Sequence, residues 1–163
     1  RYYKFKHKEV GDYKRIVNVS SSAHYGIDFE FDNMNGEKKY SGFDVYKKSK
    51  LANVMFTYEL AKRIEGTGIT ANCLHPGFVS TNFGKNNNFL WRNVIRVAMW
   101  LTAISVKDGA KTSIHLACSD EVKDITGRFF ANSQIKKGSS KAKNEEHNRK
   151  LWELSEEFVE KFV

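Results

Sequence analysis

Residues 46–63 read YKKSKLANVMFTYELAKR, and this stretch determines both the fold and the chemistry that the chain can support. Tyr46 and Lys50 are four residues apart, close to one turn of an α-helix, so the phenol and the ammonium lie on one face. Around them, residues 43–65 favour a helix with two apolar stripes, and Gly66 suits a C-terminal stop. A helix that is apolar on two sides is expected between a sheet and either another helix or a second subunit of a homo-oligomer.

Two strand-like segments flank this helix. Residues 15–20 (RIVNVS) predict a buried strand, because three of the six residues are β-branched. Residues 69–74 (ITANCL) predict the next strand, which leads into Pro76 and Gly77. A strand, a crossover helix and a second strand imply parallel pairing with right-handed connectivity. The predicted fold class is therefore α/β with a parallel sheet.

The remaining sequence fits one domain. The chain has 163 residues, of which 40% are hydrophobic and 28% are charged, values that are ordinary for a globular protein. Residues 1–14 are a leader of unclear structure, and residues 15–163 form the domain. The other predicted segments are a loop excursion, a helix, a short strand, a basic loop and an amphipathic helix, at residues 24–42, 106–119, 127–131, 135–143 and 144–162.

Charge and cysteine content narrow the classes of partner. The formal net charge is +8, but the lysines are spread along the chain, so a solvated basic surface is favoured over a site for nucleic acid. The two cysteines, Cys73 and Cys118, lie in no CxxC motif and in no group with metal-ligand spacing. We therefore expect no metal site and a reducing, intracellular location, either cytoplasmic or peripheral to a membrane.

Residues 89–104 are the most membrane-like segment. They are shorter than the roughly 20 residues that cross a bilayer, and two arginines, Arg92 and Arg96, interrupt them. Two interpretations stay open: an interfacial helix that makes peripheral contact with a membrane, and a lid or substrate-loop helix that packs on the domain. The lid is the favoured one.

The chemistry predicted for the Tyr-Lys pair is proton transfer. A phenol has a pKa near 10, and lowering it by about three units requires roughly 4 kcal/mol of stabilisation of the phenolate. A positive charge about 4 Å away at an effective dielectric constant near 20 supplies that much. Lys50 is the candidate charge, and the hydroxyl of Ser21, at the end of a strand, would hold a substrate oxygen. Ser21, Tyr46 and Lys50 are the predicted catalytic residues.

Four stretches of the sequence resemble a known family when taken together. They are RIVNVSSSAH (15–24), YKKSKLANVMFTYELAKR (46–63), GITANCLHPGFVSTNF (68–83) and DGAKTS (108–113). In this combination the chain resembles the short-chain dehydrogenase/reductase family, in particular its retinol dehydrogenase-like branch, from about residue 15 onward. The resemblance implies a Rossmann-like domain of three layers and hydride transfer between a nicotinamide cofactor, NAD or NADP, and an alcohol or carbonyl.

The resemblance also implies roles for individual residues. Ser21, rather than Ser20, positions the substrate. Tyr46 is the acid/base and also contacts the cofactor, and Lys50 tunes Tyr46 and binds the nicotinamide ribose. The turn that follows the second strand bears on the nicotinamide, through Pro76, Gly77, the backbone of Val79 and the hydroxyl of Thr81. NADP is favoured over NAD by the resemblance, and the expected substrate is an apolar alcohol or carbonyl, such as a retinol-like or lipid-aldehyde-like molecule.

The sequence departs from the family pattern at its start. The sequence contains no glycine-rich turn of the kind that binds a pyrophosphate. Residues 1–14 do not resemble the helix that, in the family, precedes the strand corresponding to residues 15–20. We therefore expect a partial Rossmann-like domain that lacks the amino-terminal cofactor-binding strands. The alternative to an oxidoreductase is a catalytically inactive remnant that acts as an interaction module through its exposed sheet edge.

Overall fold

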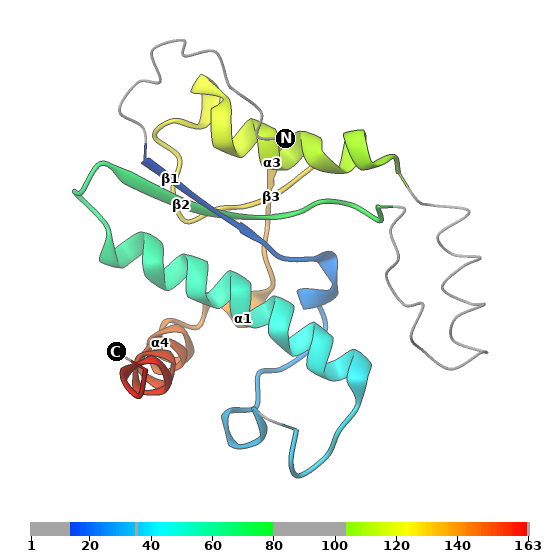
Figure 1. Cartoon of the computed structure of the whole chain (residues 1–163), viewed down its shortest axis with the longest axis vertical. Coiled ribbons are helices and arrows are strands. Elements are labelled where there is room, and N and C mark those ends of the chain that lie inside the picture. Colours follow the sequence, from blue (N-terminus) through cyan, green and yellow to red (C-terminus); the bar gives the residue numbers. More distant parts are fainter. Residues whose placement is uncertain (1–13, 35, 80–103, 163) are drawn as a thin grey trace.

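The computed structural model describes residues 14–34, 36–79 and 104–162, and their core is an open sheet (Figure 1). The four strands lie in the order β1-β2-β3-β4, and they span Lys14–Val19, Ile69–His75, Phe129–Ala131 and Gln134–Lys136. The first three strands are parallel, and β4 is antiparallel to β3. The predicted parallel α/β sheet is confirmed.

Helices cover both faces of the sheet. They are α1, α3 and α4, which span Gly42–Arg63, Val106–Cys118 and Glu145–Glu160. Helices α1 and α4 lie on one side of the sheet and α3 lies on the other, which confirms the predicted three layers (Figure 1). Short 3₁₀ turns η1 to η4 occupy Ser22–His24, Phe31–Asn33, Asp120–Val122 and Ser140–Lys143.

The sheet divides the core into two clusters, because successive residues of a strand point to opposite faces. Cys73 and Phe129 face α1, whereas their neighbours Leu74 and Phe130 face α3. The cluster on the α1 side also contains Leu51, Val54, Met55, Ala142 and Leu151. The cluster on the α3 side also contains Leu116 and Val122.

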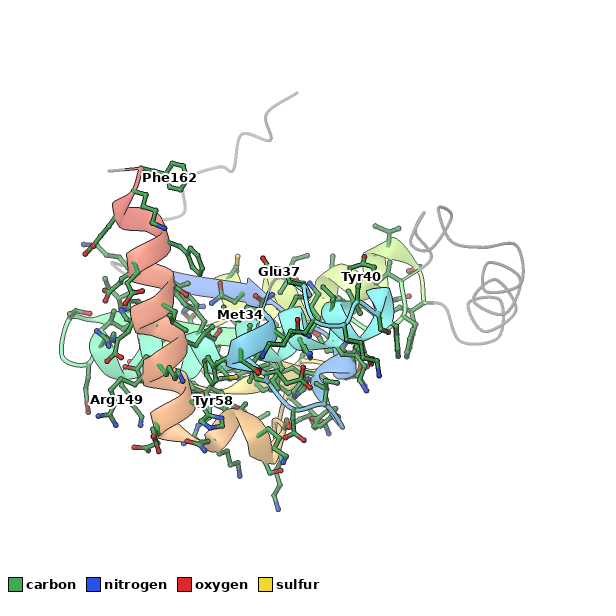
Figure 2. The ribbon with its side chains drawn as sticks, turned by 90° about the horizontal axis from the view of Figure 1, so that it is seen from below. Met34, Glu37, Tyr40, Tyr58, Arg149 and Phe162 are labelled. Atoms are coloured by element: carbon green, nitrogen blue, oxygen red, sulfur yellow. The ribbon has the colours of Figure 1, made fainter. Side chains whose placement is uncertain are left out.

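Helix α1 is covered on two sides, as its sequence predicts. The sheet covers one side, and α4 crosses the other (Figure 2). The ring of Phe56 stacks on that of Trp152 of α4 at 5.1 Å between centroids, and the guanidinium of Arg63 lies 4.6 Å from the centroid of the Trp152 ring. The helix gives way to a turn in which Gly66 has a φ of 78°, a left-handed conformation that favours glycine. A segment of the same chain therefore supplies the second surface.

The prediction of a loop over residues 135–143 is wrong at its start, where β4 forms a hairpin with β3. Asn132 and Ser133 connect the strands with φ values of 53° and 57°, the backbone that a type I′ hairpin turn requires. All three residues of β4 are exposed, so its sequence carries no pattern of burial from which a strand could be read.

The prediction of an interfacial or lid helix over residues 89–104 falls almost entirely on residues outside the described ones and stays a prediction. Within the described ranges, each helix is either too short or too polar to cross a membrane.

Candidate active site at the carboxyl ends of the strands

The parallel strands bring the predicted site residues to one edge of the sheet. Val19 pairs with Leu74, so the residues that follow β1 and those that follow β2 emerge side by side. The amide of Ser20 donates to the carbonyl of Leu74 at 2.7 Å and extends the pairing by one step. In open α/β sheets, the crevice outside the carboxyl ends of the strands is where ligands bind. The turns at Ser21 and Pro76 both begin at this edge.

Helix α1 begins at the same edge and carries the Tyr-Lys pair in its first turns. The ammonium of Lys50 lies 5.5 Å from the centroid of the Tyr46 ring, within reach of a cation–π contact, and both residues are partly buried. The structure thus brings together the phenol and the cation that the sequence places on one helical face.

A polar seam fixes this helix against β1. We use this name for three hydrogen bonds: Ser20 Oγ to the Lys50 carbonyl (2.7 Å), Asn53 Nδ2 to the Val19 carbonyl (3.1 Å), and Asn18 Nδ2 to Thr57 Oγ1 (2.9 Å). Three consecutive residues of the chain therefore contact successive turns of the helix. The seam sets the register of α1 against β1 and holds Lys50 beside the serines.

The seam gives a prediction for Ser20, which is 2% exposed. Replacing it with alanine removes the hydrogen bond to Lys50, and we expect a loss of about 1 kcal/mol in the free energy of unfolding, measured by urea denaturation. Ser49→Ala is the matched control, because the exposed Ser49 donates to the Tyr46 carbonyl at 2.7 Å on the same helix. The control should change stability by less than about 0.5 kcal/mol. Equal losses in the two variants would show that the buried hydrogen bond of Ser20 stabilises the chain no more than an exposed one.

Ser21 is held by hydrogen bonds to both of its oxygens. Its Oγ accepts from the amide of Ala23 at 3.2 Å and so caps η1. Its carbonyl accepts from the amide of His24 at 3.2 Å and lies 2.6 Å from His24 Nδ1. A hydroxyl that accepts one hydrogen bond can still donate its own proton. The hydroxyl of Ser20 is buried and donates its proton to the Lys50 carbonyl. The arrangement therefore favours Ser21 over Ser20 for contact with a ligand.

The Pro-Gly turn after β2 packs closely against the start of α3. Gly77 has a φ of 88°, and a Cβ on it would lie 2.6 Å from Ile104 Cδ1. The amide of Ile104 donates to the Phe78 carbonyl at 2.8 Å, and Val79 forms an isolated parallel bridge with Ile104. A Cβ on Gly109 would lie 2.4 Å from Val79 Cγ2. Ile104 and the first turn of α3 therefore pack against the Pro-Gly turn.

Several supporting residues could not be assigned from the sequence. Asn53, Ile104 and Gly109 had no predicted role, although Asn53 follows Lys50 by three residues on the same helix and Gly109 lies within the DGAKTS stretch. Thr81, a predicted cofactor contact, lies outside the described residues, and its role stays a prediction.

Two histidines lie near this edge on the α1 side. His24 is fully buried, and burial lowers its pKa below the ordinary value of 6.5, although the hydrogen bond to Ser21 acts in the opposite direction. Burial also lowers the pKa of His75, and the nearby His24 lowers it further. His75 Nδ1 is buried without a hydrogen-bond partner among the described residues. Both rings are therefore neutral in the folded chain at neutral pH.

These lowered pKa values predict that stability falls as the solution is acidified. An unfolded histidine binds a proton as the pH drops below about 6.5, whereas folded His24 and His75 stay neutral to a lower pH. The unfolded state then binds more protons, so the free energy of unfolding rises with pH. The urea midpoint should be lower at about pH 5.5 than at about pH 7.5.

The variant His24→Gln/His75→Gln should lose most of this dependence. Carboxylates whose pKa is lowered, such as those of Glu30 and Glu145, titrate below this range of pH and leave the comparison intact. A wild-type midpoint that is constant or increases on acidification would contradict the prediction.

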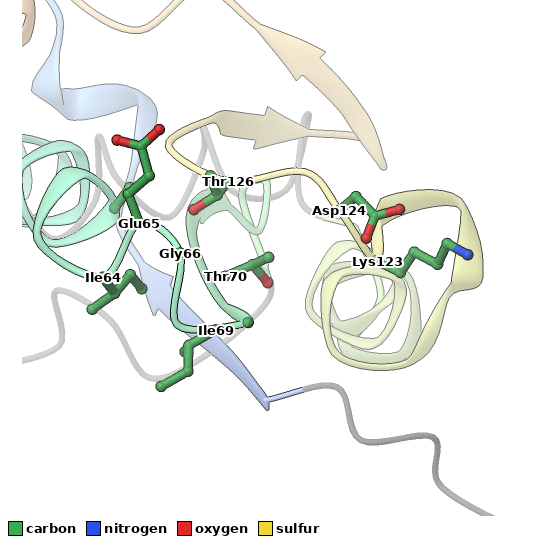
Figure 3. Close-up of a pocket in the computed structure, with 10 residues that line it drawn as sticks. Ile64, Glu65, Gly66, Ile69, Thr70, Lys123, Asp124 and Thr126 are labelled. Atoms are coloured by element: carbon green, nitrogen blue, oxygen red, sulfur yellow. The ribbon is translucent and has the colours of Figure 1, made fainter.

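A hollow in the described part of the chain lies away from this edge. It has a volume of about 410 Å³ and lies beyond the end of α1, between the turn at Ile64–Gly66 and the segment around Lys123–Thr126 (Figure 3). At 1.5 Å per residue, the turn at Ile64 lies about 27 Å along the helix from Tyr46 and about 21 Å from Lys50. The hollow is therefore no part of the candidate site.

The described residues form a Rossmann-like α/β domain. At the carboxyl edge of its sheet, α1 carries Tyr46 and Lys50 between two turns: the turn at Ser21, which we call the serine turn, and the Pro-Gly turn at Pro76 and Gly77. A model of short chain dehydrogenases matches residues 8–89, which are 82 of the 163 residues, and the chain belongs to this family.

Curated proteins that are similar to the chain include retinol dehydrogenases. Retinol dehydrogenase 14 of Mus musculus is 42% identical to the chain over 147 residues, which are 89% of the chain and 44% of that protein. Retinol dehydrogenase 12 of Homo sapiens is 36% identical over 148 residues, which are 89% of the chain and 45% of that protein. The chain is thus retinol dehydrogenase-like, and it spans less than half the length of these relatives.

Solved structures share the fold. An uncharacterised protein of Mycobacterium paratuberculosis superimposes with a TM-score of 0.58 and 25% identity, over 90% of this chain and 50% of that chain. A Serratia marcescens short-chain dehydrogenase/reductase mutant superimposes with a TM-score of 0.50 and 20% identity, over 78% of this chain and 45% of that chain.

Proposed function

We propose that the chain carries the catalytic edge of a nicotinamide-dependent oxidoreductase that interconverts an apolar alcohol and its carbonyl. The proposal depends mainly on one observation: the Lys50 ammonium lies 5.5 Å from the centroid of the Tyr46 ring. The hydroxyl of Ser20, next to Ser21, donates a hydrogen bond to the Lys50 carbonyl of the same helix. Membership of the short chain dehydrogenase family supports it.

The residues at this edge fit the nicotinamide end of such a cofactor. The Lys50 ammonium can donate to ribose hydroxyls, and the backbone around Pro76 and Gly77 can pair with an amide. His75 Nδ1, at the end of β2, is buried and has no hydrogen-bond partner among the described residues. It also fits an edge that binds polar groups, because an unsatisfied buried nitrogen costs about 1–3 kcal/mol. When bound, the cofactor supplies or accepts the hydride.

The side chains handle the oxygen and the proton. In the direction of reduction, the hydroxyl of Ser21 donates a hydrogen bond to the carbonyl oxygen, and Tyr46 transfers its phenolic proton to the same oxygen. Lys50 stabilises the phenolate that remains, which then regains a proton from solvent. In the direction of oxidation, Tyr46 accepts the proton of the alcohol.

Exposed aromatic residues near this edge support an apolar substrate. Phe78, directly after the Pro-Gly turn, is 61% exposed, and Phe43, which precedes Tyr46 by three residues on α1, is 65% exposed. The relatives are named for retinol, an apolar alcohol. We therefore propose a retinol-like or lipid-aldehyde-like substrate, with NADP as the favoured cofactor.

Cofactor titration tests this function. The purified chain should bind NADPH or NADH saturably, at micromolar concentrations, in a fluorescence or calorimetric titration. Lys50→Met should weaken the binding by at least about tenfold, because it removes a charge-assisted hydrogen bond. Lys47→Met is the matched control. It removes an ammonium from the same helix, but this ammonium donates to the Gly26 carbonyl and has no role in the proposed cofactor site. A chain that binds neither nucleotide would refute the proposal.

A second candidate function rests on the edge strand. Within the described residues, β1 pairs only with β2, and Val19 at its end is 51% exposed. An open strand edge can pair with a strand of another protein, so an inactive interaction module is the alternative. Failure of the titration in a folded chain would favour this alternative.

A further inference from the structure

His24 is a fully buried histidine whose two ring nitrogens both make hydrogen bonds. Nδ1 lies 2.6 Å from the Ser21 carbonyl, and the amide of Ser139 donates to Nε2 at 3.0 Å. A carbonyl can only accept and an amide N–H can only donate, so Nδ1 carries the proton and Nε2 carries none. A single neutral tautomer therefore satisfies both contacts, and the imidazole bridges two backbone groups.

Neighbouring rings hold this imidazole in place. The rings of Tyr25 and Phe129 lie 3.9 Å and 4.6 Å from it, centroid to centroid. Phe129 belongs to β3, so the sheet itself fixes one side of the histidine. The ring cannot turn away from Ser21 without disturbing a strand of the core.

The far end of the bridge is anchored as well. We call residues Lys137–Ser139, between β4 and η4, the 137–139 loop. The hydroxyl of Tyr25 donates to the Lys137 carbonyl at 2.5 Å. A Cβ on Gly138 would lie 2.4 Å from the hydroxyl oxygen of Tyr58, so the loop packs tightly against α1. The amide that holds His24 therefore belongs to a fixed segment 115 residues away in the sequence.

We propose that His24 is a positioning residue for Ser21, because its imidazole ties the Ser21 carbonyl to the 137–139 loop and so fixes where the Ser21 hydroxyl points. The inference rests on the proposed function, in which that hydroxyl binds the substrate oxygen. It goes further by assigning to the carboxy-terminal part of the chain a share in the geometry of the serine turn.

The alternative is a histidine that only stabilises the core, and a double-mutant cycle separates the two roles. A positioning residue acts through Ser21, so its loss costs little once the Ser21 hydroxyl is gone. A residue that only stabilises the fold has the same effect with and without that hydroxyl. The cycle uses His24→Phe, Ser21→Ala and the double variant of the full chain.

The assay is the NADPH-dependent reduction of retinaldehyde, followed together with the dissociation constant for NADPH. We expect His24→Phe to lower kcat by about 10–100-fold, since small displacements of a catalytic group have effects of this size, with NADPH affinity within about threefold of wild type. In the Ser21→Ala background, His24→Phe should lower kcat by less than about threefold. His147→Phe is the matched control, because it makes the same substitution at an exposed histidine of α4, and it should leave kcat within about threefold.

Each outcome decides between the roles. Equal losses of kcat from His24→Phe in both backgrounds would overturn the positioning role, and so would a His24→Phe chain as active as wild type. An inactive but folded wild-type chain would overturn the proposed function and, with it, the role assigned to His24.

NMR of isotopically labelled histidine in the wild-type chain keeps the inference testable if His24→Phe does not fold. The ring of His24 should carry its proton on Nδ1 and show a coupling to the Ser139 amide. A proton on Nε2 would contradict the proposed bridge even in a fully active chain.

Discussion

Replacing Tyr46 with phenylalanine is expected to lower kcat for carbonyl reduction by about 10²–10⁴-fold, the range that general acid–base catalysis contributes. The substitution removes one oxygen and leaves the ring, so the contact with the Lys50 ammonium at 5.5 Å from the ring centroid can persist. NADPH affinity should therefore change by less than about threefold. The measurement is steady-state reduction of retinaldehyde with NADPH by the purified chain.

Tyr40→Phe is the matched control for this variant. Tyr40 is 74% exposed and lies two residues before the first residue of α1, so the variant loses the same phenolic oxygen outside the helix that carries Tyr46 (Figure 2). The control should keep kcat within about twofold. Turnover by Tyr46→Phe at the wild-type rate would remove Tyr46 from the mechanism and, with it, the main support for an oxidoreductase.

Replacing Phe129 with alanine is expected to have the largest effect on stability, a loss of about 3–5 kcal/mol in the free energy of unfolding. Phe129 is 2% exposed, lies in the cluster on the α1 side and packs against the His24 ring at 4.6 Å. Since whole domains are stable by only about 5–15 kcal/mol, this loss is a large fraction of the total. Thermal denaturation should show a decrease in Tm on the order of 10 °C.

Phe158→Ala is the control for that experiment. Phe158 lies on α4 and is 48% exposed, so the same truncation should cost less than about 1 kcal/mol. If the two variants lost equal stability, the cluster on the α1 side would contribute no more to the free energy of unfolding than the exposed surface of α4.

The main elements of the fold could be predicted because burial leaves a periodic pattern in the sequence. The β-branched run at residues 15–20 and the run at 69–74 match β1 and β2 to within a residue at each end, and the helix predicted over 43–65 is α1. Strand β4 could not be predicted, because its exposed residues follow no pattern of burial.

Only the part of the candidate site that depends on local sequence could be predicted. The proximity of Tyr46 and Lys50 follows from helical geometry alone, so four residues of spacing were enough to predict it. The bridge from Ser21 through His24 to Ser139 joins residues more than 100 positions apart, and local sequence holds no sign of such a contact. The polar seam could not be predicted either, because each of its hydrogen bonds joins β1, or the residue after it, to α1 and exists only when the two pack together.

Isotope transfer from the cofactor to the product measures whether the chain transfers a hydride with the help of Tyr46. The purified chain is incubated with retinaldehyde and NADPH that carries deuterium at the transferable position of the nicotinamide, and the alcohol is examined by mass spectrometry. We expect one deuterium in each molecule of retinol formed by the wild-type chain and by Tyr40→Phe, and almost no product with Tyr46→Phe. Retinol without deuterium, or no retinol from a folded chain that has bound the cofactor, would rule out hydride transfer at this edge of the sheet.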